Sequence, residues 1–217
     1  MPVHRFRRTE TGWEEMFVGE SEGQLLAQWD APVSDGLVPA LQMLESRVGE
    51  LAPGYCSEIN LRLGGWMRAV ADTLQQGVLL LIDYGYSERE YYHPQRHAGT
   101  LICHFQHRAH DDALVLPGLQ DITANVDFSA VAHAALDAGL TLAGYTTQGN
   151  FLINSGLQMS LEMADSGDAG ARVDRLQQVK QLTLPSEMGE RFKAIAFLRE
   201  MDLPLQGFAM GDLRAYL

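Results

Sequence analysis

The sequence has few cysteines and no long apolar run. Its 217 residues include only Cys56 and Cys103, too few for a disulfide scaffold and typical of a reducing compartment. No apolar stretch reaches the roughly 18 residues that a membrane-spanning helix requires. The basic residues near the first position are followed by no apolar region, so no signal peptide is visible. We therefore expect a cytoplasmic protein without a membrane span.

Positive charge is also scarce. The chain carries 16 Lys and Arg against 28 Asp and Glu, which gives a formal net charge of −12 at pH 7. Phosphate backbones are bound by clustered basic side chains, and here only Arg5, Arg7 and Arg8 form a cluster. We therefore expect no nucleic-acid partner. An acidic surface suits solubility or a cationic partner, and charge alone favours solubility.

The first 76 residues predict a hairpin followed by helices. Alternating residues at 3–8 and 13–18 flank the turn-forming run from Thr9 to Gly12, which indicates an antiparallel hairpin. Polar, turn-rich sequence follows, so we expect a hairpin and loop over 1–36. Apolar residues at helical spacing then predict helices over 38–51 and 59–74, a helical insertion within 37–76.

The aliphatic run at 78–82 is the clearest strand signal of the chain. It leads directly into Asp83, Tyr84, Gly85 and Tyr86. Such a run is typical of a central parallel strand that is buried on both faces. Ligands of open α/β sheets bind beyond the carboxyl ends of the strands. We therefore expect Asp83, Tyr84 and Tyr86 at the functional rim.

Residues 87–120 show little periodicity, and we expect a long, lid-like loop that folds over a site. A helix capped by Asp127 or Ser129 follows. The later segments predict a strand, a helix and a last strand, over 140–147, 171–182 and 192–198. For the last of these, a helix continuing from Pro185 is the alternative. This order is typical of the closing half of a doubly wound α/β sheet, here over 77–217. The length favours one domain over 1–217.

Several strings, in order along nearly the whole chain, resemble the MidA-like S-adenosylmethionine-dependent methyltransferases of class I. Among them are Asp-Tyr-Gly-Tyr at 83–86, Tyr-Tyr-His-Pro-Gln-Arg at 91–96 and Asp-Ile-Thr-Ala-Asn-Val-Asp-Phe at 121–128. The other matching strings lie at 81–82, 90, 99–101, 107–112, 117–120, 144–152 and 185–193. The family includes the mitochondrial methyltransferase that assists assembly of respiratory complex I.

The resemblance implies the later-strand half of a Rossmann-like methyltransferase sheet, with helical insertions and an N-terminal β-hairpin. It implies methyl transfer from S-adenosyl-L-methionine, to a protein arginine. In the family the glycine-rich cofactor loop precedes the part that this sequence matches, and no Gly-x-Gly-x-Gly run is present here. We therefore expect a truncated methyltransferase chain that binds no cofactor and is not active alone. Its apolar strand at 78–82 would lack a neighbour, so we also expect self-association.

Paired carboxylates orient a guanidinium well through bidentate hydrogen bonds. Asp83 and Asp121 are the catalytic candidates, although Asp83 could instead cap the following turn, and the base itself is unassigned. For Asp127 the helix-cap interpretation is favoured. Glu58 could be a helix N-terminal acid or a pocket acid, and the first is favoured. The resemblance and the position of the loop suggest a set of substrate-binding candidates, namely Tyr84, Tyr86, Tyr91, His104, His107 and Thr123.

Two other functions remain open at this point. His104, His107 and His110 recur every third residue, which superficially offers ligands for a metal-dependent hydrolase. That spacing gathers three ligands only in a tight helix, and the local sequence is not helical, so we expect no metal. The second alternative is a non-catalytic protein-binding or assembly module that holds a partner through residues 87–120.

Overall fold

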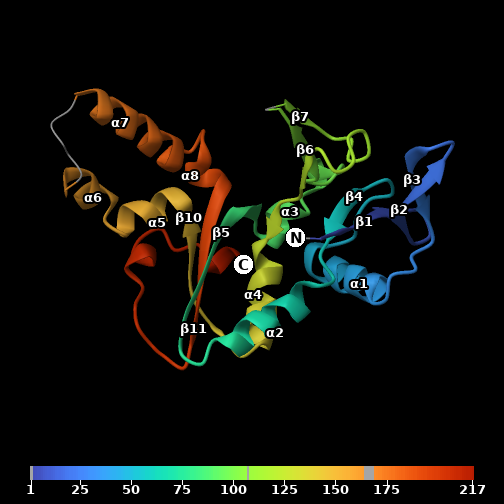
Figure 1. The fold of residues 1–217 in the computed structure, drawn as a ribbon. Helices are drawn as coiled ribbons and strands as arrows, with labels where there is room; N and C mark the ends of the chain where they lie inside the picture. Colours follow the sequence, from blue (N-terminus) through green and yellow to red (C-terminus); the bar gives the residue numbers. More distant parts are fainter. Residues whose placement is uncertain (1, 107, 164–168) are drawn as a thin grey trace. The chain divides into compact units, whose positions relative to one another are not determined.

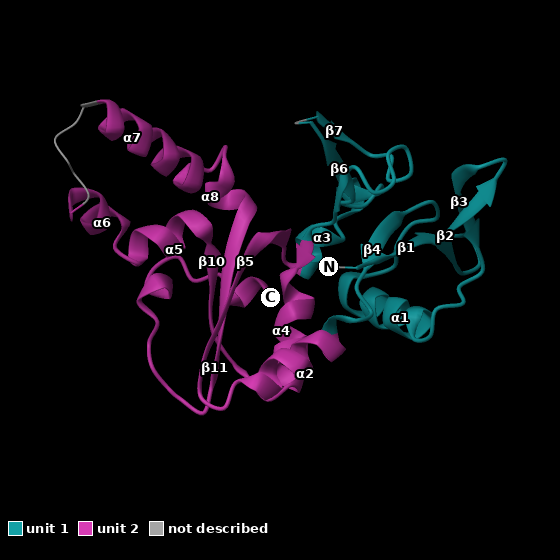
Figure 2. Cartoon of the chain, viewed as in Figure 1, with its two compact units in different colours: residues 1–63, 88–125 teal, residues 64–87, 126–217 magenta. Residues whose placement is uncertain are grey.

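The computed structural model describes residues 2–106, 108–163 and 169–217 (Figure 1). Its internal contacts divide the chain into two compact units (Figure 2). Unit 1 comprises residues 1–63 and 88–125, and unit 2 comprises residues 64–87 and 126–217. The single domain expected over 1–217 stays a prediction. Both units combine helices with sheets, and the α/β fold class is confirmed.

Unit 1 is built on a four-stranded antiparallel sheet of order β3-β2-β1-β4. Its strands are β1 (His4–Arg8), β2 (Trp13–Ser21), β3 (Gln24–Asp30) and β4 (Cys56–Ile59). The expected hairpin is confirmed as β1 and β2. The Thr9 amide donates to the Gly12 carbonyl at 2.9 Å and the Gly12 amide donates to Thr9 Oγ1 at 3.0 Å, which closes the turn.

Strand β3 corrects the prediction that polar, turn-rich sequence without a strand runs from the hairpin to Gly36. It pairs with β2 along seven residues. Glu22 and Gly23 connect the two strands and both have positive φ, 52° and 78°. That is the backbone of a two-residue hairpin turn whose twist matches the strands. Six of the seven β3 residues are exposed, so no apolar alternation marks the strand in the sequence.

Helix α1 (Leu37–Val48) confirms the first predicted helix, and its buried residues are Leu37, Leu41 and Leu44. The second predicted helix begins later than expected. The chain first forms β4 and only then α2 (Leu63–Thr73). Glu58 therefore lies on a strand, opposite Arg5 of β1, and the favoured interpretation of Glu58 as a helix N-terminal acid is wrong. The buried pair Ser57 and Glu58 is too short a signal to announce a strand.

The expected lid-like loop over 87–120 is also corrected, because it contains regular structure. It forms α3 (Glu88–Tyr91), a 3-10 turn (Pro94–Arg96), β6 (Ile102–Phe105) and β7 (Arg108–His110). With β8 (Asp121–Thr123), these strands make an antiparallel sheet of order β7-β6-β8. Strands of three or four residues are too short to show a period, so cross-strand pairing decides their structure.

Unit 2 is built on a sheet of order β10-β11-β5-β9. The strands are β5 (Gly77–Tyr86), β9 (Val126–Asp127), β10 (Thr141–Thr147) and β11 (Phe192–Arg199). Strand β11 is antiparallel to both neighbours, and five consecutive residues of it are buried. The strands expected over 140–147 and 192–198 are confirmed.

Strand β5 is present as predicted, but its expected burial on both faces is wrong. Val78, Leu80 and Ile82 share one face and are 41%, 42% and 43% exposed. Its long pairing, with β11, is antiparallel, and its parallel pairing with β9 covers only Gly85 and Tyr86. An aliphatic run shows that its side chains favour burial. Whether they are buried depends on which distant segments pack against the strand.

The helices of unit 2 are α4 (Phe128–Asp137), α5 (Gln148–Asn154), α6 (Leu157–Met163), α7 (Ala169–Thr183) and α8 (Met188–Arg191), with 3-10 turns at Gln206–Phe208 and Arg214–Tyr216. Helix α7 confirms the helix expected over 171–182. A core cluster gathers Ala194, Ala196 and Phe208, with Phe151 packed against it. Among the described residues, every helix is too short or too polar to span a bilayer.

Candidate functional site

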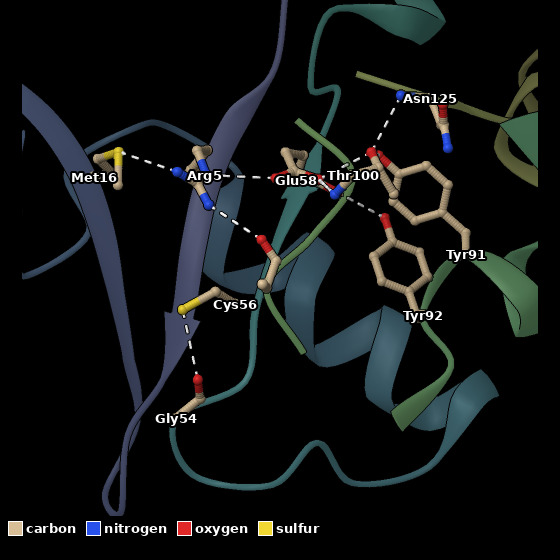
Figure 3. Close-up of polar contacts among 10 residues, drawn as sticks. Arg5, Met16, Gly54, Cys56, Glu58, Tyr91, Tyr92, Thr100 and Asn125 are labelled. Atoms are coloured by element: carbon tan, nitrogen blue, oxygen red, sulfur yellow. Dashed lines mark hydrogen bonds and ion pairs between the residues drawn. The ribbon is translucent and has the colours of Figure 1, made fainter. Parts of the chain in front are cut away.

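A buried carboxylate, Glu58, lies at the centre of a polar network in unit 1 (Figure 3). Its side chain is fully buried, and Arg5 Nε lies 3.4 Å from its Oε1 atom. Arg5 also donates from Nη2 to the Ala98 carbonyl at 3.2 Å. The two side chains meet because Arg5 and Glu58 are direct partners on antiparallel strands β1 and β4. The guanidinium thus compensates a charge that burial would otherwise disfavour.

Thr100 occupies the other oxygen of that carboxylate. Glu58 Oε2 accepts the Thr100 amide at 2.8 Å and the Thr100 hydroxyl at 3.2 Å. Thr100 Oγ1 also accepts the Asn125 amide at 3.1 Å and lies 3.1 Å from Tyr91 Oη (Figure 3). A hydroxyl offers one donor and two acceptor positions. The Thr100 hydroxyl therefore joins three separate segments of unit 1.

Two adjacent tyrosines complete the surroundings of the network. Tyr91 and Tyr92 are 2% and 4% exposed, and their ring centroids lie 4.8 Å apart. Tyr92 Oη donates to the Glu58 carbonyl at 3.0 Å. Tyr91, a substrate-binding candidate, is thus placed as a core residue of unit 1 whose hydroxyl contacts Thr100. Thr100 itself was missed by sequence reasoning, since nothing near it in the sequence marks a buried hydrogen-bonding position.

The β7-β6-β8 sheet brings three of the candidates together. His104 of β6 lies directly opposite Asp121 of β8, which puts their Cβ atoms about 5 Å apart on one face. Thr123 shares that face because it lies two residues from Asp121, and its hydroxyl lies 3.2 Å from Asp121 Oδ2. His104 and Asp121 are exposed and Thr123 is half-buried. A carboxylate, an imidazole and a hydroxyl thus line one accessible surface.

The same pairing separates the histidines of the metal hypothesis. His110 lies opposite Cys103, one residue from His104, so His104 and His110 project to opposite faces of the sheet. His107 lies outside the described residues. Within the described part of the chain, no three His, Cys, Asp or Glu residues are arranged to hold a metal ion.

The two thiols are poor nucleophiles. Burial raises the pKa of the Cys103 thiol, and the negative charges of Asp112, Asp111 and Asp121 raise it further. Burial also raises the pKa of the Cys56 thiol. Because the thiolate is the reactive form, both cysteines stay protonated near neutral pH. Chemistry in this region therefore falls to the carboxylates and the imidazole.

The other predicted rim residues belong to unit 2. Asp83 Oδ1 accepts the amide of Tyr84 at 2.8 Å, a local contact of the kind that the capping alternative expected. The Tyr84 ring packs edge-on against Phe192, with centroids 5.4 Å apart. Tyr86 is half-buried beside Asp127 of β9. The Asp127 carboxylate accepts the Ala130 amide at 3.0 Å, so its helix-cap interpretation is confirmed.

Comparison with known proteins adds the family. Residues 1–146 match the family of S-adenosyl-L-methionine-dependent methyltransferases. The chain is 31% identical over 206 residues to the zebrafish (Danio rerio) mitochondrial protein arginine methyltransferase NDUFAF7, covering 91% of this chain and 44% of that protein. It is 29% identical over 204 residues to the human (Homo sapiens) protein of the same name, covering 91% and 43%. The chain thus spans less than half the length of these curated relatives.

A solved structure agrees with the sequence relatives. A Burkholderia thailandensis protein of the COG1565 superfamily, bound to S-adenosyl-homocysteine, superposes with a TM-score of 0.92 at 38% identity. The match covers 100% of this chain and 55% of that one. Together with the matched residues 1–146, this likeness shows that the chain belongs to the MidA-like class I S-adenosylmethionine-dependent methyltransferases.

Proposed function

We propose that the protein takes part in S-adenosylmethionine-dependent methylation of a protein arginine, and that this chain supplies surfaces that face the methyl acceptor. The observation that carries the proposal is the similarity, over 91% of the chain, to proteins named protein arginine methyltransferases. The solved neighbour bound to S-adenosyl-homocysteine supports the reaction class. Because the chain spans less than half of these relatives, the activity is proposed for the whole protein.

The acceptor surface is proposed to be the face of the β7-β6-β8 sheet that carries His104, Asp121 and Thr123. A guanidinium is oriented best by a carboxylate that accepts two parallel N–H bonds, and Asp121 is accessible for this role. Methylation of a guanidinium nitrogen releases one proton. His104, opposite Asp121, carries the imidazole of this face, the side-chain type that most often accepts a proton in enzymes. Thr123 holds the Asp121 carboxylate in place.

Unit 2 supplies the second group of proposed residues, Asp83, Tyr84 and Tyr86. The two tyrosine rings could contact a cation through their faces. Asp83 remains a candidate carboxylate in spite of its contact with the Tyr84 amide, because one of its oxygens is left for another donor. Tyr91 and His107 stay in the proposed set as well, although Tyr91 is buried and His107 lies outside the described residues.

The described residues do not fit the cofactor by themselves. Their strand-to-helix junctions are β3–α1, β4–α2, β5–α3, β9–α4 and β10–α5. None carries a Gly-x-Gly-x-Gly loop through which backbone amides approach a bound nucleoside, although Gly64 and Gly65 lie at the start of α2. We predict that this chain alone does not bind S-adenosylmethionine with useful affinity. Calorimetric titration tests this, and micromolar binding by the chain would overturn it.

The cellular setting is proposed from the family and from the cysteines. A link to respiratory complex assembly is proposed from the resemblance to a family that includes a mitochondrial methyltransferase assisting assembly of respiratory complex I. The curated relatives are named as mitochondrial proteins. We place this chain in the cytoplasm on the basis of its two free cysteines. Cell fractionation followed by detection of the protein tests the location, and recovery in a membrane or secreted fraction would contradict it.

The test of function is transfer of a labelled methyl group to arginine. We would incubate labelled S-adenosylmethionine and protein acceptors with this chain and with a full-length family protein that contains it, and locate the label by mass spectrometry. Asp121→Asn and His104→Ala should lower turnover in the full-length protein more than they lower its melting temperature. Asp111→Asn, an exposed acid in the loop after β7, is the matched control. Label on lysine or on no protein would reject the proposal.

A further inference from the structure

Both ends of the segment that carries the proposed acceptor face meet at one side chain. Strand β6 begins two residues after Thr100, and β8 ends two residues before Asn125. The Asn125 amide donates to Thr100 Oγ1 at 3.1 Å. Residues 101–124 therefore leave the body of unit 1 and return to it at the Thr100 hydroxyl. That hydroxyl lies where β6 begins and β8 ends, which is called the base of the β7-β6-β8 sheet below.

Glu58 is what fixes Thr100. Its Oε2 atom accepts both the amide and the hydroxyl of Thr100, a two-point contact that leaves the residue little rotational freedom. Glu58 in turn is fully buried on β4 and ion-paired with Arg5 of β1, which limits the positions that its carboxylate can take. Figure 3 shows this order of contacts from Arg5 through Glu58 and Thr100 to Asn125. The network thus connects the main sheet of unit 1 to the smaller one.

The backbone at Gly99 passes very close to the Glu58 carboxylate. Gly99 has a φ of +84°, and a Cβ atom there would lie 2.2 Å from Glu58 Oε1. The chain therefore passes so close to the carboxylate that only glycine fits. A buried ion pair is weak evidence for stability, since apolar side chains of similar volume often do as well. Its directional contacts do, however, select one arrangement of the segments that they join.

We propose that Glu58 is a positioning residue, which acts through Thr100 to hold the base of the β7-β6-β8 sheet and so orients His104, Asp121 and Thr123. The effect on catalysis rests on the proposed function. The mechanical part, that Thr100 holds both ends of residues 101–124, is independent of any activity. Loss of the Thr100 hydroxyl should loosen the smaller sheet while β1 to β4 keep their structure.

Hydrogen exchange tests the mechanical part. Thr100→Val keeps the shape of the side chain and the amide contact with Glu58, but removes every contact of Oγ1. Amides of β6 and β8 should then exchange at least ~10-fold faster, while those of β1 and β2 stay within about twofold. Thr100→Ser restores the hydroxyl and should restore slow exchange. Unchanged exchange in β6 and β8, or equal acceleration in all strands, would overturn the proposal.

Kinetics in the full-length protein test the catalytic part. Thr100→Val and Glu58→Gln should lower kcat/KM for the arginine acceptor about 10-fold and leave KM for S-adenosylmethionine unchanged, since acceptor orientation is what is lost. Glu14→Gln is the control, because Glu14 pairs with Arg7 on the same sheet and has no contact with Thr100. Equal losses for Thr100→Val and Glu14→Gln would reject the positioning role. If no acceptor is methylated at all, the proposed function fails and hydrogen exchange still decides the role of Thr100.

Discussion

Glu15 of β2 holds the segment that follows β3. Its Oε2 atom accepts the amides of Val33 and Ser34, both at 3.0 Å, and its Oε1 atom accepts the Ser34 hydroxyl. His4 Nδ1 lies 3.0 Å from Oε1. Burial by itself would raise the pKa of this carboxyl, but the hydrogen bonds from Ser34, His4 and Val33 outweigh it and lower the pKa from 4.5 to about 2.

This pKa predicts how stability depends on pH. A carboxyl whose pKa is depressed in the folded state adds stability that is complete above the unfolded pKa and is lost as pH falls from 4.5 towards 2. The contribution is at most about 3 kcal/mol. Glu15→Gln should therefore be less stable than the parent chain at pH 7, and the difference should shrink between pH 5 and pH 3. Urea unfolding across that range measures it, and a difference independent of pH would contradict it.

Gly99 allows a second residue-scale prediction. Gly99→Ala forces a left-handed conformation on alanine, which costs about 1 to 2 kcal/mol, and also overpacks the held Glu58 carboxylate, which typically costs about 1 to 3 kcal/mol more. Gly54 has nearly the same φ, +86°, but open space around its Cβ position. Gly54→Ala should therefore lose only the stability that the left-handed backbone conformation costs. Thermal unfolding of both variants tests this. Equal losses of stability would show that the Glu58 carboxylate moves aside to make room for the new Cβ atom.

At the scale of elements, helix α4 depends on one capping side chain. Asp127 accepts the Ala130 amide and satisfies one of the free N–H groups at the helix start. Asp127→Ala should cost about 1 kcal/mol of unfolding free energy, and Asp127→Asn should cost less because it keeps an acceptor oxygen. Thr147, which caps α5 through the Asn150 amide, provides a comparison of the same type. A stable Asp127→Ala variant would show that β9 pairing, not the cap, begins α4.

Elements with local causes could be predicted from the sequence. The β1–β2 hairpin follows from the turn between Thr9 and Gly12, and α1 follows from the spacing of Leu41, Leu44 and Val48. Strand β3 could not be predicted, because its side chains are exposed and its pairing rests on the backbone. Strands β6 to β8 could not be predicted either, because each spans four residues or fewer and so shows no alternating pattern.

The candidate site was predictable by residue type but not by arrangement. His104, Asp121 and Thr123 are named by sequence reasoning, yet their common face depends on a strand register between distant segments. The Arg5–Glu58–Thr100 network is harder still, because its three members lie on segments that only the fold brings together. The local sequence favoured a helix at Glu58, and pairing with β1 overrode it.

At the scale of the whole molecule, strand β5 predicts self-association. Over residues 77–84 one of its edges pairs with β11, while β9 pairs only with Gly85 and Tyr86. Val78, Leu80 and Ile82 are also accessible on one face. Open apolar edges and patches of this kind bind other chains. Light scattering during size-exclusion chromatography should show species larger than a monomer at micromolar concentration.

A substitution makes this test specific. Leu80→Lys places a charge on the accessible face of β5 and should shift the chain towards monomer. Val173→Lys, on a half-exposed position of α7, changes charge equally and should leave association unaltered. A parent chain that is a cooperatively folding monomer would contradict the prediction and would show that the aliphatic face of β5 is tolerated in water.

The shared anchor at Thr100 also bears on how this fold can diversify. The two ends of residues 101–124 are held together at Thr100, so the length of this segment can change at little cost in stability. Doubling the length of a loop costs only about 0.6 kcal/mol in closure entropy. Residues 101–124 can therefore be exchanged for another segment while Thr100 and Asn125, which hold its two ends together, stay unchanged. A graft that keeps Gly99, Thr100 and Asn125 can carry a longer or differently charged segment on an unchanged frame. Under the proposed function, such a graft would change the acceptor preference.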